Sequence, residues 1–420
     1  MTSGWLTPYA DRPVQATVLL PGSKSITNRA LVLAAIADRP SRLHRPLRAR
    51  DTELMMAALQ SLGVGMDRVA NAIVVTPQPL RGPAAIDCGL AGTVMRFVPA
   101  IAGLAAGRVH FDGDARARQR PLGVMLAALR TLGVAIGQEA VSLPFDCVGA
   151  GAVRGGVVRL DSSGSSQFVS GLLLAGARYD SGVDVRHCGD PIPSMPHIAM
   201  TVAMLRERGV AVDDSAPNRW VVAPGPIAAV DVDVEPDLSS AAPFLAAALV
   251  TGGTVTIPGW PGQTTQAGDR LRSILTEFGA QVTHSGDALT VAGTGRFDGI
   301  DVDLHETGEL TPVIAAVAAL ADSPSHLGGI AHLRGHETDR LTALRIELTA
   351  LGGDVRETDD GLEIRPRQLT GQLFHTHGDH RLAHAAVVLG LAVPHVYVDD
   401  IATAGKTYAD FDAAWTELLR

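Results

Sequence analysis

The sequence predicts an α/β protein of two domains, each built from three copies of one repeated unit. The repeat is visible as a recurring sequence motif, in which a helical stretch ends in Leu and is followed by Gly and a β-forming residue. Each interval between copies holds two apolar helical stretches and short Val-rich strands. The length of 420 residues agrees with this division, because one hydrophobic core rarely organises so long a chain.

Each copy of this motif has a glycine directly after its helical stretch. Such a glycine has a physical role, because the residue after a helix commonly adopts the left-handed backbone conformation. Successive glycines are 70, 76, 70 and 73 residues apart, and a sixth copy would end near residue 420, where Trp415–Leu419 closes the chain. The five glycines are Gly63, Gly133, Gly209, Gly279 and Gly352.

The first copy shows how one unit is expected to fold. Residues 26–37 and 52–62 have helical spacing and composition, and Ile73–Val75 is typical of a strand. Six such units indicate two domains of three units, with the crossover in residues 227–236, where Asp and Val alternate. Because strands do not alternate singly with helices, a Rossmann or TIM arrangement fits poorly.

Composition narrows the class of protein. Hydrophobic residues make up 46% and charged residues 19%, which is typical of a globular protein, and the formal net charge of −9 argues against a general nucleic-acid-binding surface. No apolar run approaches the roughly 18 residues that span a membrane, and residues 1–16 hold no signal-peptide core. Three cysteines without a C-x-x-C pair favour a reduced cytoplasmic enzyme over a disulfide scaffold.

Only two lysines occur in the chain, Lys24 and Lys406, against 33 arginines. One explanation is a codon bias that favours arginine over lysine and has left two lysines by chance. The alternative is that both positions need a compact charge that can lose its proton, which a guanidinium does not do. On that hypothesis, the two ends of the chain bind one anionic substrate.

Small-residue and hydroxyl-rich loops precede several expected helices. Helix N-termini carry unpaired N–H groups and partial positive charge, so these loops are candidate phosphate sites. The loop around Lys24 lacks the glycine spacing of a P-loop. A single loop of this kind is more often just a helix cap, but recurrence in successive units strengthens the functional interpretation. The loops are residues 21–29, 88–96, 161–167 and 194–196.

Histidines cluster in residues 375–384. His380 and His384 share a helical face, so a zinc site is one hypothesis. The segment offers no carboxylate in a known zinc spacing, and Arg381 would repel a cation. We therefore expect no metal.

Taken together, these segments resemble the 5-enolpyruvylshikimate-3-phosphate (EPSP) synthases, also called 3-phosphoshikimate 1-carboxyvinyltransferases. The matching strings run nearly from end to end, and the ordered set is far more specific than any one string. They are PGSKSITNRAL at residues 21–31, AGT at 91–93, RP at 120–121, SSQF at 165–168, ETDRL at 337–341, DHR at 379–381 and KT at 406–407.

The resemblance implies an inside-out α/β fold with two domains, each of three βαβαββ units in pseudo-threefold symmetry. It implies that residues 1–19 and 237–420 form one domain and residues 20–236 the other, with the active site in the cleft between them. It also implies a cytoplasmic monomer in the shikimate pathway, which leads to chorismate and the aromatic amino acids.

The implied substrates are shikimate 3-phosphate and phosphoenolpyruvate, and the implied reaction releases phosphate by addition and elimination. No metal, nucleotide or other cofactor is implied. Inhibition by glyphosate is expected, because Gly92 leaves room beside the phosphoenolpyruvate phosphate.

Motif positions carry the family's site residues onto this chain. The resemblance implies that Lys24, Glu309 and Glu337 are catalytic. The implied ligands of shikimate 3-phosphate are Lys24, Ser25, Arg29, Ser165, Ser166, Gln167, Ser194, Glu309 and His336. The implied ligands of phosphoenolpyruvate are Lys24, Gly92, Arg120, Gln167, Arg340, Arg381 and Lys406.

Several positions depart from the family pattern. Glu309 stands where the family has Asp, which keeps a carboxylate base but lengthens its reach. His336 replaces a lysine, His197 a tyrosine and Leu90 an asparagine, so substrate contacts at these positions are open. Gly378 stands where the family often has Asn.

Two rival functions share the scaffold. UDP-N-acetylglucosamine enolpyruvyl transferases usually carry a cysteine in the loop that corresponds to residues 112–121, and this loop has none. A non-catalytic phosphate-binding protein would be expected to lack Lys24, Glu309 or Glu337, and all three are present.

Overall fold

The computed structural model describes residues 4–419. By its internal contacts, the chain divides into two compact units. We call residues 1–21 with 235–420 the terminal unit, and residues 22–234 the central unit. The chain therefore leaves the terminal unit after 21 residues and returns to it after residue 234.

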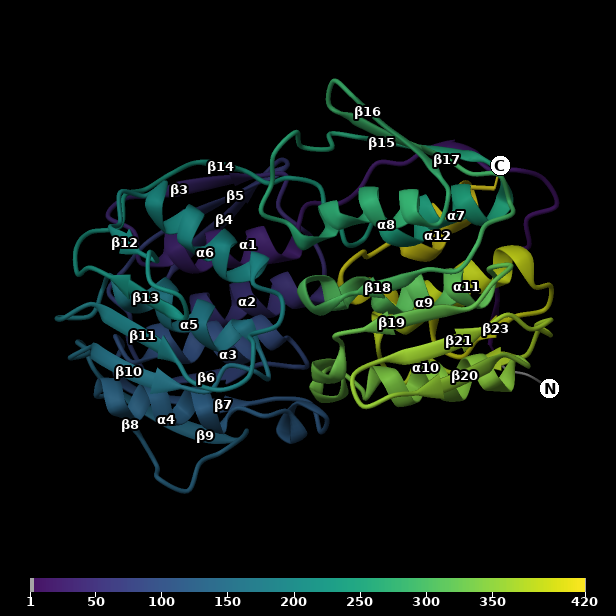
Figure 1. The fold of residues 1–420 in the computed structure, drawn as a ribbon. Helices are drawn as coiled ribbons and strands as arrows, with labels where there is room; N and C mark the ends of the chain where they lie inside the picture. The colour runs from purple at the N-terminus through teal and green to yellow at the C-terminus, as the bar shows by residue number, and fades with distance from the viewer. Residues whose placement is uncertain (1–3, 420) are drawn as a thin grey trace. The chain divides into compact units, whose positions relative to one another are not determined.

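The central unit holds three four-stranded sheets of one topology, in the orders β14-β3-β5-β4, β6-β7-β9-β8 and β10-β11-β13-β12 (Figure 1). The first repeat contains α1 (Lys24–Ala35), β3 (Ser41–His44), α2 (Arg50–Ser61), β4 (Gly65–Val69), β5 (Ala72–Thr76) and β14 (Val232–Asp233). The second contains β6 (Ala84–Asp87), α3 (Gly92–Ala102), β7 (Ala106–Asp112), η1 (Ala117–Gln119), α4 (Gly123–Leu132), β8 (Ala135–Ile136) and β9 (Phe145–Ala150). The third contains β10 (Gly156–Leu160), α5 (Ser166–Gly176), β11 (Val183–His187), α6 (Pro196–Arg206), β12 (Val212–Asp213) and β13 (Arg219–Val222).

The terminal unit repeats this plan, with sheets β16-β17-β15-β2, β18-β19-β21-β20 and β1-β23-β22. Its first repeat contains β2 (Gln15–Thr17), α7 (Ala242–Thr251), β15 (Thr254–Pro258), η2 (Ala267–Arg270), α8 (Leu271–Glu277), β16 (Gln281–Ser285) and β17 (Ala288–Ala292). The second contains β18 (Asp301–Asp303), η3 (His305–Leu310), α9 (Thr311–Ala319), β19 (Ser325–Gly328), η4 (Ala331–Gly335), α10 (Arg340–Ala350), β20 (Asp354–Glu357) and β21 (Leu362–Arg365). The third contains β22 (Leu373–Phe374), α11 (His380–Ala392), β23 (Tyr397–Val398), η5 (Ile401–Lys406), α12 (Phe411–Glu417) and β1 (Trp5–Leu6).

Within residues 4–419, the six sheets share a pattern of strand pairing. Each sheet holds one parallel pair, such as β6 and β7, and five of the six also hold an antiparallel hairpin, such as β8 and β9. Strands distant in sequence complete three of the sheets. β14 pairs with β3, β2 pairs with β15, and β1 pairs with β23. The sixth repeat therefore uses β1 in place of a hairpin of its own.

The predicted helix-ending glycines are confirmed. Gly63, Gly133, Gly209, Gly279 and Gly352 all have positive φ, between 74° and 104°. Each follows the second helix of its repeat, where an L-residue would be strained in the left-handed conformation.

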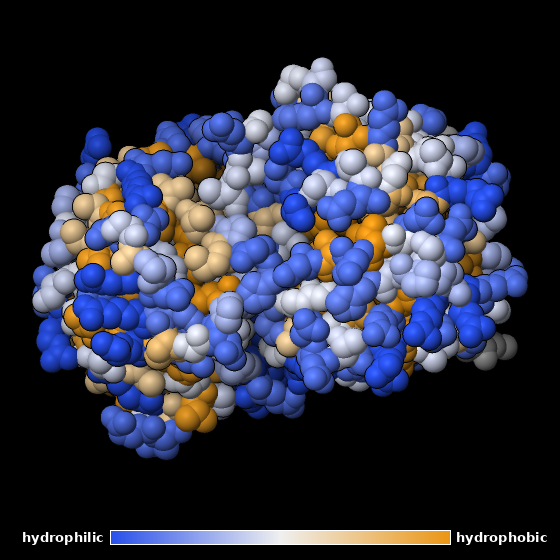
Figure 2. Space-filling view, viewed as in Figure 1, coloured by the Kyte–Doolittle hydropathy of each residue, from blue (hydrophilic) through white to orange (hydrophobic). Residues whose placement is uncertain are grey.

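The first helix of each repeat is almost entirely buried, as in α3, whereas the second buries one face, as in α4. All eleven residues of α3 are buried, and apart from Arg96 the run MRFVPAIA is apolar on every side of the helix. In β9 the residues alternate between buried and exposed, so one face of the strand meets the core and the other faces solvent. Figure 2 shows hydrophilic residues over much of the visible face, with hydrophobic residues in scattered groups.

The predicted elements of the first repeat exist, with small shifts of their ends. The helix expected over residues 26–37 is α1, which begins at Lys24 because the Ser23 side chain accepts a hydrogen bond from the Ile26 N–H. The expected helix 52–62 is α2, and the expected strand is β5.

Candidate active site

The first helices of the three central-unit repeats begin close together. Asn28 in α1 donates to the Thr93 hydroxyl in α3 over 2.7 Å, and Arg29 in α1 lies 3.4 Å from the Ser170 hydroxyl in α5. Ser165 caps α5 by accepting from the Gln167 N–H at 3.3 Å. The helix starts predicted from the loops therefore gather in one region of the central unit, where their unpaired N–H groups favour an anion.

Gly92 lies at the centre of this region. An ideal Cβ at Gly92 would lie 3.0 Å from Nη1 of Arg96, 3.1 Å from Oε1 of Gln167 and 3.2 Å from Nη2 of Arg120. Three of the predicted site residues, Gly92, Arg120 and Gln167, are thus neighbours, and any side chain at Gly92 would crowd the other two.

Arg120 and Arg96 bring buried positive charge to Gly92. Arg120 donates to the Leu90 carbonyl at 3.3 Å, while its buried Nε has no hydrogen-bond partner among residues 4–419. Arg96 lies over the Phe168 ring, 5.5 Å from its centroid. Sequence reasoning missed Arg96 as a site residue, although it falls one turn after Gly92 on the same helix.

Lys24, the first residue of α1, forms an ion pair with Asp51. The Nζ–Oδ2 distance is 3.3 Å, and only 3% of the Asp51 side chain is exposed. A nearly buried carboxylate thus fixes the amine at the start of the helix. Sequence reasoning missed Asp51, because an acidic residue in the first turn of a helix is ordinarily explained by the helix dipole.

Arg29 is buried and occupied by protein groups. Its guanidinium donates to the Thr201 hydroxyl at 2.8 Å, to the His197 carbonyl at 3.0 Å and to the Ser25 carbonyl at 3.1 Å. Burial lowers the pKa of Arg29 to about 9. Arg29 thereby joins α1 to α6, and its role as a substrate ligand stays a prediction.

Ser194 lies just before α6 with φ of 55°, a conformation that a non-glycine residue seldom adopts. The helix that follows, α6, begins at Pro196, a residue that suits the first turn. Such backbone strain is frequent at ligand-binding positions. Ser166, the first residue of α5, is buried.

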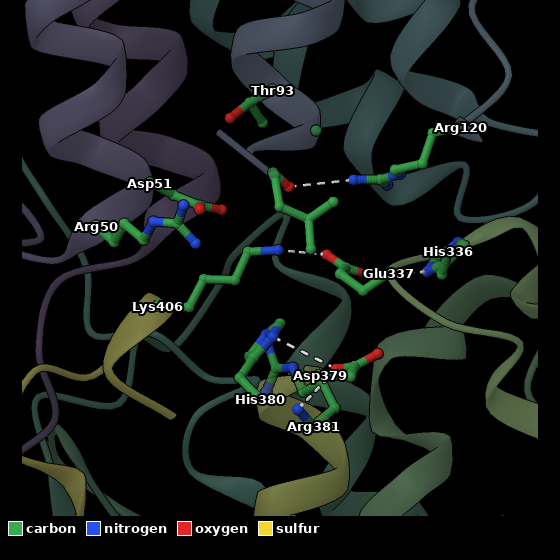
Figure 3. A network of polar contacts seen from close by, with 12 residues as sticks. Arg50, Asp51, Thr93, Arg120, His336, Glu337, Asp379, His380, Arg381 and Lys406 are labelled. Atoms are coloured by element: carbon green, nitrogen blue, oxygen red, sulfur yellow. Dashed lines mark hydrogen bonds and ion pairs between the residues drawn. The ribbon is translucent and has the colours of Figure 1, made fainter. Parts of the chain in front are cut away.

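In the terminal unit, two cations share the carboxylate of Glu337. Lys406 Nζ lies 2.7 Å from Oε1 (Figure 3), and Arg340 Nη2 lies 3.3 Å from Oε2. Lys406 and Glu337 are 7% and 8% exposed, so solvent screens this pair weakly. Two predicted phosphoenolpyruvate ligands and one predicted catalytic carboxylate are therefore in contact.

Arg381 at the start of α11 and Glu309 in η3 add to the same group. Arg381 donates from Nη1 to the Ser239 carbonyl at 2.7 Å, and the Ser239 hydroxyl donates to Oε1 of Glu309 at 3.3 Å. Arg340 and Asp379 form a buried ion pair at 2.8 Å. Sequence reasoning missed Ser239 and treated Asp379 only as part of a motif.

Burial and charge act oppositely on these arginines. Burial lowers the pKa of Arg340, but the nearby charges of Asp379 and Glu337 raise it by more than burial lowers it, so the net shift is upward. The pKa of Arg381 is lowered, chiefly by burial. Both guanidinium groups remain charged at neutral pH, so the group retains its affinity for an anion.

His336 lies beside this group. Its Nδ1 atom is 3.2 Å from Nη1 of Arg340 and 3.9 Å from Oε2 of Glu337. The His332 ring lies 5.7 Å from that of His336.

The two histidines of the zinc hypothesis are buried in α11. Their ring centroids lie 6.0 Å apart, and His384 stacks on Phe411 at 4.5 Å. Burial lowers the pKa of His384 well below its usual value. Over residues 4–419 no three His, Cys, Asp or Glu side chains are grouped to hold a metal ion. Nor does that part of the chain contain a helix long and apolar enough to cross a membrane.

Comparisons with known proteins identify the family. The family model described as EPSP synthase (3-phosphoshikimate 1-carboxyvinyltransferase) matches residues 8–415. The chain belongs to the EPSP synthase family. A 3-phosphoshikimate 1-carboxyvinyltransferase of Kocuria rhizophila is 53% identical over 428 aligned positions, which cover 99% of this chain and 96% of that protein.

Solved structures agree on the fold. Two structures of EPSP synthase from Acinetobacter baumannii superpose with TM-scores of 0.80 and 0.78 at 23% identity, covering 99% of this chain and 97% of each of theirs. The predicted α/β fold of repeated units is confirmed.

Proposed function

We propose that the protein transfers the carboxyvinyl group of phosphoenolpyruvate to the 5-hydroxyl of shikimate 3-phosphate and releases phosphate. Family membership and the relative from Kocuria rhizophila support this function. The observation that carries it is the carboxylate of Glu337, held between Lys406 and Arg340 in a buried group of cations. Such a group binds anions and offers a carboxylate for proton transfer.

Two polyanions must be held together for this reaction. Like unit charges about 6 Å apart repel by roughly 3 kcal/mol at an effective dielectric near 20. Fixed cations offset this repulsion, although the whole chain has a net charge of −9. We assign Gly92, Arg120, Gln167, Arg340, Arg381, Lys24 and Lys406 to phosphoenolpyruvate.

Shikimate 3-phosphate is assigned to the hydroxyl-rich helix starts of the central unit and to two residues of the terminal unit. The proposal requires both units to act on the same pair of substrates. The assigned residues are Lys24, Ser25, Arg29, Ser165, Ser166, Gln167, Ser194, Glu309 and His336.

The carboxylates are assigned to the proton transfers of the reaction. Glu309 takes the proton of the 5-hydroxyl as that oxygen bonds to the enol carbon, and Glu337 or Lys24 delivers a proton to the methylene carbon. The group that delivered this proton then takes one back from the methyl group of the tetrahedral intermediate as the C–O bond to phosphate breaks, which restores the double bond and releases phosphate. The Ser239 hydroxyl bond to Glu309 orients that base.

Mixing the purified protein with both substrates in a chelating buffer tests the proposal. Phosphate and the enolpyruvyl product are expected in equal amounts, by colorimetry and NMR. Glu337→Gln should lower turnover about 10²-fold or more, whereas the partly exposed control Glu363→Gln should not. Phosphate release with UDP-N-acetylglucosamine but not with shikimate 3-phosphate would contradict the proposal.

We also propose a cytoplasmic monomer. Cys88, Cys147 and Cys188 are all free thiols, which suits a reducing compartment. Sedimentation at micromolar concentration should give a mass near 43.7 kDa, and a dimer mass would contradict the monomer.

A further inference from the structure

Asp379 joins the two arginines of the terminal unit. Its side chain is completely buried at the start of α11. Oδ2 accepts from Nε of Arg340 at 2.8 Å, and Oδ1 accepts from Nη2 of the same guanidinium at 3.2 Å. Oδ1 also accepts from the backbone N–H of Arg381 at 2.9 Å (Figure 3).

The bidentate contact fixes how the Arg340 guanidinium is turned. A planar fork that shares two N–H groups with one carboxylate keeps a single orientation. The edge that faces Asp379 is thereby occupied, and Nη1 points to His336 instead. Oε2 of Glu337 accepts from Nη2 of the same guanidinium at 3.3 Å, which is longer than the 2.8 Å contact with Asp379.

The same carboxylate fixes the start of Arg381. Because Asp379 caps α11 through the Arg381 N–H, the Cα of Arg381 has a set position relative to the Arg340 guanidinium. The Arg381 side chain then extends to the Ser239 carbonyl. One buried carboxylate thus sets the relative placement of cations from α10 and α11.

Removal of this charge would redirect Arg340. Glu337 would be the remaining carboxylate in contact with the guanidinium, and Glu337 also binds Lys406. Arg340 would then turn toward Glu337, and the two cations would compete for one carboxylate.

We propose that Asp379 is a positioning residue that orients Arg340 and Arg381 together for phosphoenolpyruvate. This inference rests on the proposed function. It predicts that loss of Asp379 weakens the binding of phosphoenolpyruvate and not that of shikimate 3-phosphate. A residue needed only to cap a helix would not show this difference.

Asp379→Asn tests this, because asparagine keeps the helix cap and removes the charge. We expect KM for phosphoenolpyruvate to rise about 10- to 100-fold, as for loss of a charge-assisted hydrogen bond, with KM for shikimate 3-phosphate within about twofold of the parent. The matched control is Asp339→Asn, which makes the same change at the cap of α10 and should leave both KM values unchanged.

A second variant shows whether Asp379 acts through Arg340. In an Arg340→Lys background, Asp379→Asn should have little further effect on KM for phosphoenolpyruvate, because the fork it orients is gone. Asp379→Glu gives the same comparison, with the charge displaced, if the asparagine variant does not fold.

The outcomes are distinguishable. Equal rises in both KM values, an unchanged KM for phosphoenolpyruvate, or full additivity with Arg340→Lys would overturn the inference. Absence of phosphate release by the parent protein would overturn the proposed function instead.

Discussion

Both lysines of the chain are paired with nearly buried carboxylates. Lys24 pairs with Asp51, and Lys406 pairs with Glu337. Codon bias alone does not explain why each retained lysine has such a partner. A compact ammonium suits a carboxylate that must also serve chemistry, because it contacts one oxygen and leaves the other for a second partner.

Lys24→Ala is expected to lower turnover about 10²-fold or more, because it removes a preorganised charge and leaves Asp51 buried without it. Steady-state phosphate release measures the effect. Arg12→Ala, at an exposed position of the terminal unit, is the control for loss of a cation. Near-parental turnover of the Lys24 variant would show that Lys24 only begins the helix.

Gly92→Ala is expected to weaken the binding of both phosphoenolpyruvate and glyphosate. The new Cβ would lie 3.0–3.2 Å from Arg96, Gln167 and Arg120, so at least one of them must move. We expect KM for phosphoenolpyruvate to rise about tenfold and glyphosate inhibition to weaken by more, consistent with the loss of one or two charge-assisted contacts.

The control for that prediction is Gly225→Ala, where no atom of residues 4–419 other than Gly225 and its chain neighbours lies within 4 Å of the added Cβ. Kinetics of both variants at several glyphosate concentrations give the comparison. Equal inhibition of Gly92→Ala and the parent would contradict the prediction.

At the scale of elements, the repeat could be predicted because it depends on local chemistry. A left-handed residue after a helix requires glycine, so Gly63 and Gly133 are visible in the sequence without knowledge of the fold. Helix starts were visible for the same reason, as the Ser23 and Ser165 caps show.

The contacts that hold the site residues in place could not be predicted, since they join segments distant in sequence. Asp379 meets Arg340 across 39 residues, and Ser239 meets Glu309 across 70. An aspartate before a helix reads as a cap whether or not it also holds an arginine. The pairing of β14 with β3 and of β2 with β15 was not visible in the strands themselves, because a short strand carries no sign of its partner, although the family resemblance placed residues 1–19 with residues 237–420.

Packing of η3 against η4 should make stability depend on pH through His332. Burial, with the charges of His305 and Arg340, lowers the pKa of His332 to about 4. The unfolded chain, with a pKa near 6.5, then binds a proton more readily. Stability from this group is present above pH 6.5 and falls as pH drops to about 4, by roughly 3 kcal/mol.

Urea unfolding of His332→Gln and the parent between pH 7 and 4 measures this contribution. The variant should lose less stability on acidification, although it is less stable at pH 7 because it disturbs the ring packed against Gly308. His44→Gln, at an exposed histidine, is the control. Parallel curves for His332→Gln and the parent would contradict the assignment.

At the scale of the molecule, each unit has its own hydrophobic core. One core lies wholly within residues 26–234, and the other combines Val14 and Val18 with residues 238–418. A continuous chain therefore forms the central unit, whereas the terminal unit needs both ends of the chain.

A fragment of residues 22–234 is accordingly expected to fold alone, with cooperative urea unfolding and dispersed NMR signals. A fragment of residues 235–420 should not, because β15 and β23 lose their partners β2 and β1, which leaves two sheet edges open. Joining residues 4–21 through a flexible linker to the end of residues 235–419 should restore folding. Shortening the first fragment to residues 22–226 is the matched control, since it removes β14 from β3 and should lower stability in the same way. Cooperative folding of residues 235–420 without the N-terminal segment would show that β1 and β2 are dispensable to the terminal unit.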